Sequence, residues 1–532
     1  MVYYFNRKTQ ETTWDKPSEL MSDDEKAYAS DWVWVPDELE VYIAGRIIDG
    51  TNNNAIIVEL ESGEERICKK GQLISMKKSS LQRIVSDLTL LDEMSIPLIL
   101  HCLRKRFESG KIYSAIGTIL ISINPYTQLD LYTPKMIRKY RNSLEEHREV
   151  PPHVFVVADQ AYKGLTFDSG PNQSIVISGE SGAGKTEATK QCLSYLGAVA
   201  GSVAGVERKV FDANPILEGF GNAKTVRNNN SSRFGKYVEI YMNKHLQLMG
   251  GKTTNYLLEK IRVSKQGESE RNYHFFYMLT KGCDRTLRQE LELKSPDSYL
   301  ICTGGHCVQV PGINDKNDFE EVNEAFNTLQ FNKKDVHSIF RFIAGILHIG
   351  NIKFDVVKSS FADDSSSVSK STLSELTKCA KLWQVDPKRL EKGVTHKALV
   401  MPGNKTVESG LNPKNAIDQR NSLIKFVYSK LFDWLVLQIN KSMEPKSKVY
   451  KSIGLLDIFG FEIFNKNSLE QLCINFCNEK LQQLFNYTVF KLEEKVYKSE
   501  NIGVDHVPFI DNQPILDMIE HVCLFFYSCV IT

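Results

Sequence analysis

Residues 179–186 of this 532-residue chain have the composition of a phosphate-binding loop. They read GESGAGKT, so glycines at positions 179 and 184 precede Lys185 and Thr186. Glycines let a tight loop turn its backbone N–H groups toward phosphate oxygens, the lysine reaches the β- and γ-phosphates, and the threonine hydroxyl can bind Mg²⁺. The strand-forming run 174–178 leads into the loop, and a helix-forming stretch follows it. The segment therefore predicts a nucleoside triphosphate site rather than a chance glycine-rich turn.

Two further segments carry groups that phosphoryl transfer needs. Residues 228–236 read NNNSSRFGK, and residues 457–462 read DIFGFE after the apolar strand pattern 453–456. The reaction needs a second hydroxyl on the metal, donors around the γ-phosphate, a backbone N–H that senses it, and a group that holds the attacking water. A Ser-Ser-Arg or an Asp-x-x-Gly alone is more often an ordinary turn. All three segments together favour a catalytic site.

Together with NPILEGFGNAKT at 214–225, these segments resemble the motor domain of the myosin family. The resemblance extends from about Trp32 to about Glu520. Kinesins share the Ser-Ser-Arg and Asp-x-x-Gly motifs, but the FGK at 234–236 and the FE at 461–462 fit myosins. The resemblance implies an α/β fold of the P-loop type, with a twisted, mostly parallel central sheet flanked by helices. It also implies ATP and Mg²⁺ as cofactors.

The family's residue roles can be carried over to matching positions. Asn228 would steady the phosphate chain, Gly460 would donate its N–H to the γ-phosphate, and Ser231 would orient the attacking water or relay its proton. Arg233 would pair with Glu462 to close the pocket, unless the two form only a surface pair of little value. The expected catalytic residues are Lys185, Asn228, Ser231, Arg233, Gly460 and Glu462. The expected phosphate contacts are Gly179, Glu180, Ser181, Gly182, Ala183, Gly184, Lys185, Thr186 and Asn228. The expected metal ligands are Thr186, Ser232 and, through water, Asp457, and the expected purine contacts are Asn124, Pro125, Tyr126 and Tyr132.

Coupling to movement is expected through a helix that begins near Ser468. Loss of the γ-phosphate would remove contacts from switch I (228–233) and switch II (457–462), and the family's relay helix would transmit that change. Ser468 and Gln471 match a capping box, which predicts a fixed start for the helix. In the segment expected to face actin, Lys405 or, with a shift of one residue, Thr406 stands at the family's regulatory position.

The first residues predict a separate hairpin. Residues 3–17 read YYFNRKTQETTWDKP, which resembles the second and third strands of a WW domain. In that family, Tyr4 and Trp14 would form a groove for proline-rich peptides. The first WW strand is not in this sequence, so residues 1–20 are expected to be a partial WW domain that is marginal by itself. An ordinary hairpin with exposed aromatic residues is the alternative.

Three larger segments follow from the periodicity. Residues 30–78 alternate apolar and polar residues, with turn signals at 49–50 and 62–64, which predicts a small β-barrel. Residues 80–532 are expected to be the motor domain, incomplete at its C-terminus, with buried sheet strands near 117–123, 174–178 and 453–456. Asn412 and Pro413 predict the start of a helix whose apolar stripe lies in the core. Residues 359–371 are polar and predict a surface loop.

Composition adds few constraints. Lys and Arg number 66 and Asp and Glu number 65, so charge predicts neither a nucleic-acid partner nor a membrane surface. The 11 cysteines show no CxxC pair, which fits a reducing cytoplasm. Cys473 and Cys477 lie four residues apart on an expected helix. Core packing is favoured over metal binding because no histidine or further cysteine completes a set of metal ligands. No apolar run is long enough to span a membrane.

The C-terminal residues depart from the family after about Glu520. HVCLFFYSCVIT at 521–532 stands where the resemblance implies an actin-binding segment, a further sheet strand beside 175–177, a converter and a lever. We therefore expect an open sheet edge with Ile175 or Val176 exposed, and a chain that is aggregation-prone and inactive alone. The function expected is that of an actin-based motor in the cytoplasm, with calmodulin-like light chains only if a lever follows. The alternative is a non-motor adaptor that binds nucleotide and recruits proline-rich ligands.

Overall fold

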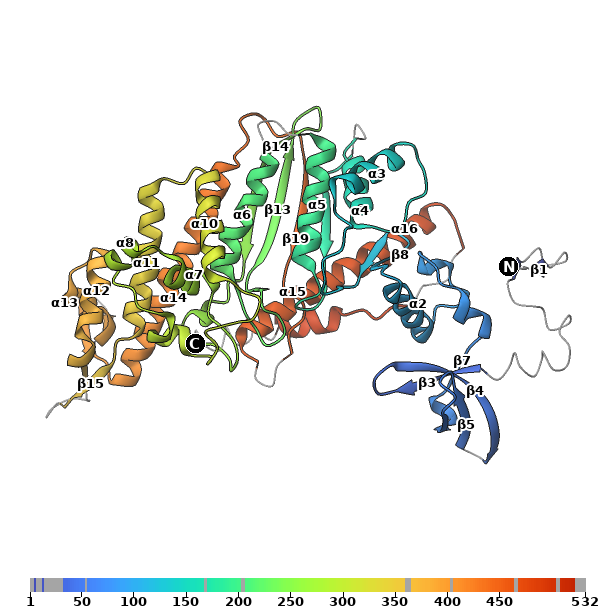
Figure 1. Ribbon diagram of the computed structural model, residues 1–532, viewed down its shortest axis with the longest axis horizontal. Helices are drawn as coiled ribbons and strands as arrows, with labels where there is room; N and C mark the ends of the chain where they lie inside the picture. Colours follow the sequence, from blue (N-terminus) through green and yellow to red (C-terminus); the bar gives the residue numbers. More distant parts are fainter. Residues whose placement is uncertain are drawn as a thin grey trace. The chain divides into compact units, whose positions relative to one another are not determined.

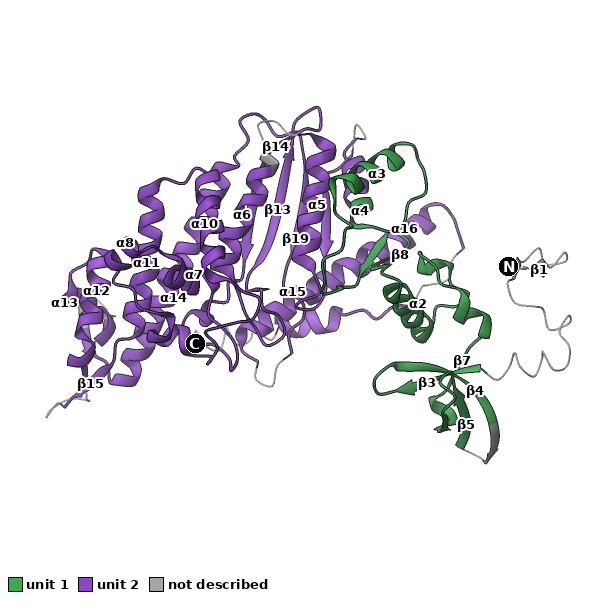
Figure 2. Cartoon of the chain, in the orientation of Figure 1, with its two compact units in different colours: residues 1–157 green, residues 158–532 purple. Residues whose placement is uncertain are grey.

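The computed structural model describes residues 4–5, 12–13, 32–52, 55–166, 170–201, 206–358, 365–401, 405–463, 467–503 and 508–521. The chain divides into two compact units, residues 1–157 and residues 158–532 (Figure 2). Within the described residues, no helix is both long enough and apolar enough to cross a membrane.

A five-stranded antiparallel sheet dominates the first unit, in the order β6-β5-β4-β3-β7. Alternate residues of β3 point to opposite faces of this sheet. Val33 and Val35 pack with Val58 and Leu60 on one face, whereas Trp34 packs into a different cluster. The strands are β3 (Trp32–Asp37), β4 (Val41–Asn52), β5 (Ala55–Leu60), β6 (Glu65–Lys69) and β7 (Ile74–Ser75). The β-strands expected in 30–78 are present, but the expected turn at 49–50 is wrong because β4 continues to Asn52.

The remainder of the first unit is short helices and two hairpins. Strands β1 (Tyr4–Phe5) and β2 (Thr12–Thr13) pair antiparallel, as in a hairpin, with Tyr4 opposite Thr13. The other elements are η2 (Lys70–Gln72), η3 (Lys78–Gln82), η4 (Leu88–Leu90), α2 (Ile96–Glu108), β8 (Tyr113–Ile116), β9 (Ile119–Ser122), α3 (Pro134–Glu145) and the start of α4 (Val154–Gly164). The strand expected at 117–123 is therefore not part of the central sheet, because it turns back at Gly117 and pairs with β8.

The central sheet of the second unit has the order β10-β19-β13-β14. Its strands are β10 (Gln173–Ile177), β13 (Gly235–Met242), β14 (Leu248–Tyr256) and β19 (Lys451–Asp457). Only β10 and β19 run parallel, while β13 is antiparallel to both β19 and β14. The α/β fold class is confirmed, but the described sheet is mixed rather than mostly parallel, because β13 and β14 form a local hairpin that needs no crossover.

Strand direction brings three loops to one edge of this sheet. The parallel strands β10 and β19 end together, with Ile177 opposite Asp457. The antiparallel strand β13 begins at the same edge, with Lys236 opposite Asp457. The loop after β10, the loop before β13 and the loop after β19 therefore meet without any long connection. These are the three segments whose residue types predicted a phosphoryl-transfer site.

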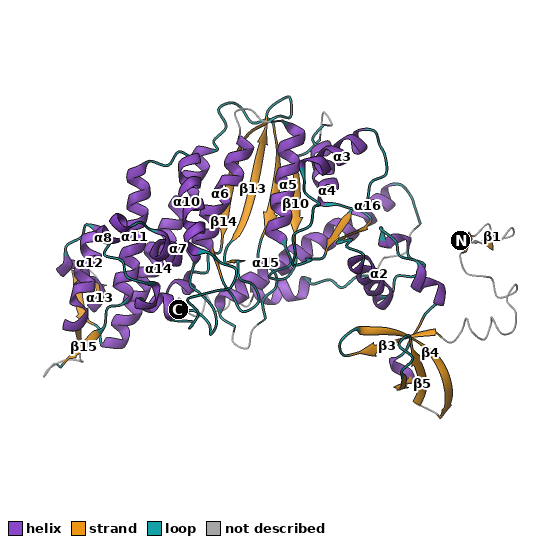
Figure 3. Ribbon diagram, viewed as in Figure 1, coloured by secondary structure: helices purple, strands orange, loops and turns teal. Residues whose placement is uncertain are grey.

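Helices line this sheet (Figures 1 and 3). Helix α5 (Lys185–Ala200) contacts β10 and β19, and α6 (Val206–Gly221) contacts β14. Helix α14 (Pro413–Ser442) packs on β14 and starts as expected, since the Asn412 side chain accepts a hydrogen bond from the Asn415 N–H. Ile424, Leu431 and Leu435 of α14 are buried and Val427 is half-buried, which agrees with the expected core stripe.

The other elements of the second unit are mainly helical. They are β11 (Asn222–Ala223), β12 (Ser231–Ser232), η5 (Lys260–Val263), α7 (His274–Gly282), α8 (Arg285–Glu290), η6 (Pro296–Ser298), α9 (Leu300–Thr303), α10 (Asp315–Thr328), α11 (Lys333–Gly350), β15 (Phe354–Val357), β16 (Ser365–Val368), η7 (Lys370–Thr372), α12 (Leu373–Trp383), α13 (Pro387–Thr395), β17 (His396–Met401), β18 (Lys405–Gly410), α15 (Leu469–Asn486), the π-helical turn η8 (Tyr487–Lys491) and α16 (Leu492–Ser499).

Several local expectations can now be compared with these elements. The polar stretch 359–371 is not simply a loop, because Ser365–Val368 is strand β16, paired with β15; residues 359–364 lie outside the described residues. Lys405 and Thr406 lie in the hairpin of β17 and β18. Cys473 and Cys477 are half-buried on α15 rather than fully in the core.

Strand β10 is an edge of the described part of the sheet. Val176 is 46% exposed, as expected for an unpaired edge, whereas Ile175 is only 8% exposed. The expectation that Ile175 or Val176 would be exposed is met by Val176. Ile175 is buried because alternate side chains of a strand point to opposite faces and helix α5 contacts this strand.

A buried hydrogen-bonded pair joins α11 to α12. His348 Nδ1 lies 2.6 Å from Glu375 Oε2, and its Nε2 lies 3.1 Å from the Leu291 carbonyl oxygen. The hydrogen bond from His348 lowers the pKa of Glu375 to about 2, against the opposing effect of burial.

We expect Glu375→Gln to reduce the free energy of urea unfolding by roughly 2 kcal/mol at pH 7. Because the folded-state pKa of Glu375 is depressed, its contribution is present above the unfolded pKa and is lost as the pH falls toward 2. Unfolding curves at pH 7, 5 and 3 should show the two variants converging at low pH. Glu292→Gln, which removes a more exposed carboxylate paired with Lys378 and Lys381, is the control and should change stability little.

Candidate nucleotide site

The loop 179–184 has the backbone of a phosphate cradle. Gly182 and Gly184 have φ angles of 84° and 95°, in the left-handed region that favours glycine. Gly184 is the N-cap of α5, which begins at Lys185. The free N–H groups of the first helical turn therefore face the loop, and this arrangement favours an anion.

Lys185 turns its ammonium onto the loop itself. Its Nζ donates to the carbonyl oxygens of Gly179 at 2.7 Å and Glu180 at 2.8 Å. Burial lowers the pKa of Lys185, although the nearby carboxylates of Asp457, Glu462 and Glu180 oppose that effect. A partly desolvated cation held only by backbone carbonyls would gain from a phosphate oxygen, so this side chain fits the role predicted for it.

Thr186 connects the loop to switch II. Its hydroxyl donates to Asp457 Oδ2 at 2.8 Å, and the buried Lys236 ammonium lies 3.7 Å from the same oxygen. A threonine hydroxyl beside an aspartate is a suitable pair of oxygen donors for Mg²⁺, directly or through water. Lys236 was not predicted to take part, and it neutralises part of the charge of Asp457.

Switch I approaches the loop through its serine and asparagine residues. Ser231 Oγ lies 3.2 Å from Ser181 Oγ, and Asn228 Cβ lies 3.8 Å from where a Cβ at Gly182 would be. The short strand β12 holds Ser231 and the half-buried Ser232, paired with β11. The structure thus brings the predicted switch I residues beside the cradle.

Gly460 of switch II lies directly against the cradle. A Cβ at position 460 would overlap the Gly179 carbonyl oxygen and come within 2.7 Å of Glu180 Cα. Only glycine allows this approach, because both neighbours are backbone atoms that cannot rotate away. The close packing explains why a glycine stands at this position in DIFGFE.

Arg233 and Glu462 form the predicted pair, and it is buried. Arg233 Nη1 donates to Glu462 Oε1 at 3.0 Å and Nη2 to Oε2 at 3.4 Å. Arg233 is 2% exposed and Glu462 is 6% exposed, so the alternative of a surface pair is wrong. Burial lowers the pKa of Arg233, but the attraction of Glu259 and of Glu462 outweighs burial and raises it above its usual value.

The relay helix α15 holds Glu462 from the other side. The Glu462 N–H donates to Asn475 Oδ1 at 2.8 Å, and Asn475 Nδ2 donates to the Glu462 carbonyl oxygen at 2.8 Å. Gln471 Nε2 lies 3.3 Å from Glu462 Oε2. Helix α15 starts at Leu469 with Ser468 as its N-cap and with both halves of the capping box, as expected. Asn475 and Gln471 were not predicted as contacts of switch II.

The expected purine contacts belong to the first unit. Tyr126 is 84% exposed and has a φ of 50°, and its N–H donates to Asn124 Oδ1 at 2.9 Å across Pro125. Tyr132 contacts Tyr113 through their hydroxyl oxygens at 2.8 Å.

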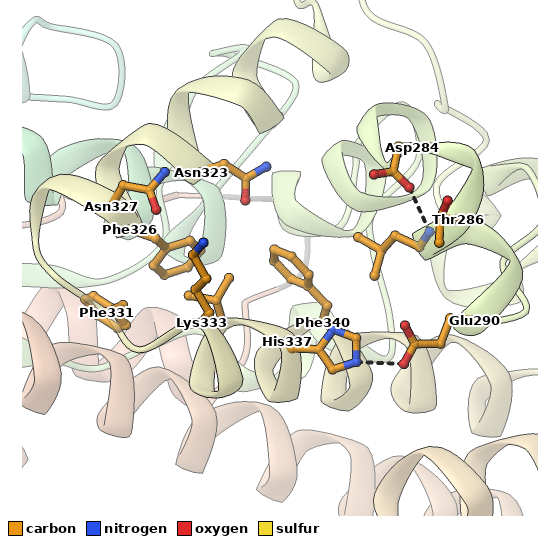
Figure 4. Close-up of a pocket in the computed structure, with 12 residues that line it drawn as sticks. Asp284, Thr286, Glu290, Asn323, Phe326, Asn327, Phe331, Lys333, His337 and Phe340 are labelled. Atoms are coloured by element: carbon orange, nitrogen blue, oxygen red, sulfur yellow. Dashed lines mark hydrogen bonds and ion pairs between the residues drawn. The ribbon is translucent and has the colours of Figure 1, made fainter.

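A separate hollow of about 410 Å³ lies among α8, α10 and α11 (Figure 4). Phenylalanine rings form much of its wall, and His337 pairs with Glu290 at its rim at 2.7 Å. None of its lining residues belongs to the three loops.

Comparisons with known proteins agree with this geometry. The family model for the myosin head (motor domain) matches residues 85–525, and the model for the myosin N-terminal SH3-like domain matches residues 21–76. This chain belongs to the myosin head family. The matched N-terminal module is SH3-like and begins at residue 21, so nothing supports the prediction of a partial WW domain in residues 1–20.

Several myosin heavy chains are similar to this myosin head. The high molecular weight form of myosin-1 of Acanthamoeba castellanii is 45% identical, over 93% of this chain and 32% of that protein. Unconventional myosin heavy chain 6 of Caenorhabditis elegans is 40% identical over 92% of this chain and 23% of its own length. The myosin-I heavy chain of Dictyostelium discoideum is 43% identical over 82% of this chain and 18% of its own length. The chain thus spans about a third or less of these relatives.

We expect Gly460→Ala to displace switch II from the cradle, because the added methyl group meets immovable backbone at Gly179 and Glu180. Backbone amide exchange across 457–462 should rise at least about tenfold, which corresponds to roughly 1.4 kcal/mol within the usual range for overpacking. Gly503→Ala adds the same methyl group where nothing lies within 4 Å, and should leave that exchange unchanged. Equal exchange in both variants would contradict the close packing.

Proposed function

We propose that this chain is the nucleotide-binding part of an actin-based motor that hydrolyses ATP. The observation that supports it most directly is the meeting of three loops at one edge of the sheet, joined by the buried pair of Arg233 and Glu462. A P-loop next to a closed pair of switch segments is what phosphoryl transfer requires. Actin and a cytoplasmic, cytoskeletal location are proposed from the family alone.

The chain's own residues divide the work of the site. The cradle amides, Lys185 and Asn228 bind and orient phosphate oxygens, and Gly460 offers its N–H to the γ-phosphate. Arg233 with Glu462 closes the pocket and excludes bulk water, which strengthens every polar contact inside. Ser231, whose Oγ lies 3.3 Å from Arg233 Nη1, would orient the attacking water or relay its proton. Thr186, Ser232 and, through water, Asp457 would hold Mg²⁺, which when bound neutralises developing phosphate charge.

Coupling to movement is proposed to run from Glu462 into α15. The backbone and side chain of Glu462 bond to Asn475 and Gln471, so a shift of switch II changes the first two turns of that helix. The π-helical turn at Tyr487–Lys491 then interrupts the helix at its far end. Such turns are found at sites where helices bend or change register. Calmodulin-like light chains are proposed only for a chain that carries a lever segment.

A nucleotide-binding adaptor without motor activity is the competing function. Hydrolysis separates the two, since an adaptor needs binding alone. We expect the 532-residue chain alone to show no actin-activated turnover, and a head completed with the C-terminal part of a related myosin to show it. Turnover by neither protein, despite tight nucleotide binding, would favour the adaptor.

Lys185→Ala should weaken binding of a fluorescent ATP analogue by at least about 100-fold, because the charge-assisted phosphate contact is worth roughly 3 kcal/mol. Lys209→Ala is the matched control: its ammonium bonds the Ser442 carbonyl oxygen at 2.9 Å and should leave affinity unchanged. Fluorescence titration measures both. Unchanged affinity in Lys185→Ala would refute the assignment of the site.

Breaking the Arg233 and Glu462 pair, by Arg233→Glu or Glu462→Arg, should leave nucleotide binding but stop hydrolysis in the completed head. Exchanging both charges should restore turnover only in part, because Glu259 lies 2.6 Å from Arg233 Nε and would face the new glutamate. Single-turnover rates measure hydrolysis and fluorescence measures binding. Normal turnover in either single variant would show that the pair does not close the pocket.

A further inference from the structure

Arg233 is bound by a second carboxylate, Glu259, for which the sequence predicted no role. Its Nε donates to Glu259 Oε2 at 2.6 Å, which is shorter than either of its bonds to Glu462. Glu259 is 8% exposed. The two carboxylates therefore contact different edges of one buried guanidinium: Glu259 the Nε edge and Glu462 the outer nitrogens.

Glu259 is itself fixed by its backbone. Its N–H donates to the Arg233 carbonyl oxygen at 2.9 Å, and its own carbonyl accepts from the Tyr273 hydroxyl at 2.8 Å. Tyr273 is fully buried and stacks on Tyr428 of α14. This anchor belongs to the segment after β14, whereas Glu462 follows β19 and is held by α15.

A second arginine balances the charge. Arg262 Nε lies 2.7 Å from the same oxygen, Glu259 Oε2, and Arg262 Nη1 lies 3.0 Å from Glu270 Oε2. The attraction of Arg262 and Arg233 lowers the pKa of Glu259 in spite of its burial. Glu259 therefore stays ionised between two guanidinium groups, and it can bind Arg233 whether or not Glu462 is in contact.

We propose that Glu259 is a positioning residue that holds the Arg233 guanidinium in the plane that meets Glu462, so that switch II alone has to move when the pair forms. A guanidinium is a planar fork, and a contact on one edge fixes the direction of the other. Without Glu259, Arg233 would have to be ordered each time the pocket closes. This inference rests on the proposed function for its effect on hydrolysis, but not for its effect on switch I.

Glu259→Gln in the full chain tests the proposal, with no nucleotide present. We expect backbone amide exchange across 231–236 to rise at least tenfold, because Arg233 loses its charged anchor. Glu375→Gln is the matched control: it removes a carboxylate of similar burial, whose partners are His348, Lys294 and Lys378, and should raise exchange of that segment much less than Glu259→Gln does, even though it lowers the overall stability. Glu259→Asp keeps the charge on a shorter side chain and should give a smaller rise, which preserves the test should Glu259→Gln fail to fold.

Nucleotide measurements separate this inference from the proposed function. In the Glu259→Gln chain, affinity for a fluorescent ATP analogue should change less than threefold, while the single-turnover rate, wherever the wild type shows one, should fall at least tenfold. Failure of the wild-type chain to bind the analogue would overturn the proposed function and leave the exchange result to decide on Glu259. Exchange across 231–236 that is unchanged in a folded Glu259 variant, or raised equally in Glu375→Gln, would overturn the inference.

Discussion

The site depends on a single buried arginine. Removing a guanidinium from water costs several kcal/mol unless carboxylates with good geometry surround it. Arg233 meets that condition with Glu259 on one edge and Glu462 on the other, and Arg262 and Glu270 extend the cluster. Loss of one carboxylate would leave buried positive charge without a partner. The free-energy cost of that loss is far larger than the net stabilisation that the intact pair provides. Switch I, switch II and the segment after β14 are therefore held in mutual position by charge.

The sheet makes this cluster possible. Its register sets Ile177, Asp457 and Lys236 side by side at one edge, so the loops that follow or precede these residues start within contact of one another. The approach is close enough that Gly460 has no room for a side chain against Gly179. Charge then acts over hydrogen-bond distances in a region from which water is excluded, where electrostatic contacts are strongest.

Features that depend on neighbouring residues were predicted from the sequence, whereas most contacts between distant residues were not. The P-loop, the helix starts at Asn412 and Ser468, and the β10 and β19 strands depend on neighbouring residues, and each lies where the sequence indicated. The pair of Arg233 and Glu462, 229 residues apart, was found only because both lie in family motifs. No role was predicted for Glu259 or Asn475, because their partners Arg233 and Glu462 lie 26 and 13 residues away and come within reach only in the folded chain. The strand expected at 117–123 was wrong because its apolar residues fit a hairpin as well as a central strand.

Glu462 makes two groups of contacts, which bear on the closure and the coupling proposed for it. Its carboxylate faces Arg233, while its backbone N–H and carbonyl bond to the Asn475 side chain of α15. A movement of switch II that breaks the contact with Arg233 would also displace Asn475, because the Asn475 side-chain amide makes two hydrogen bonds to the backbone of Glu462. Under the positioning role proposed for Glu259, the arginine side is the fixed point of this movement, since the Glu259 carboxylate bonds to Arg233 Nε at 2.6 Å. Motion at the nucleotide site would thus appear at α15 rather than in the sheet, whose strands are held by a continuous backbone ladder from β10 to β14.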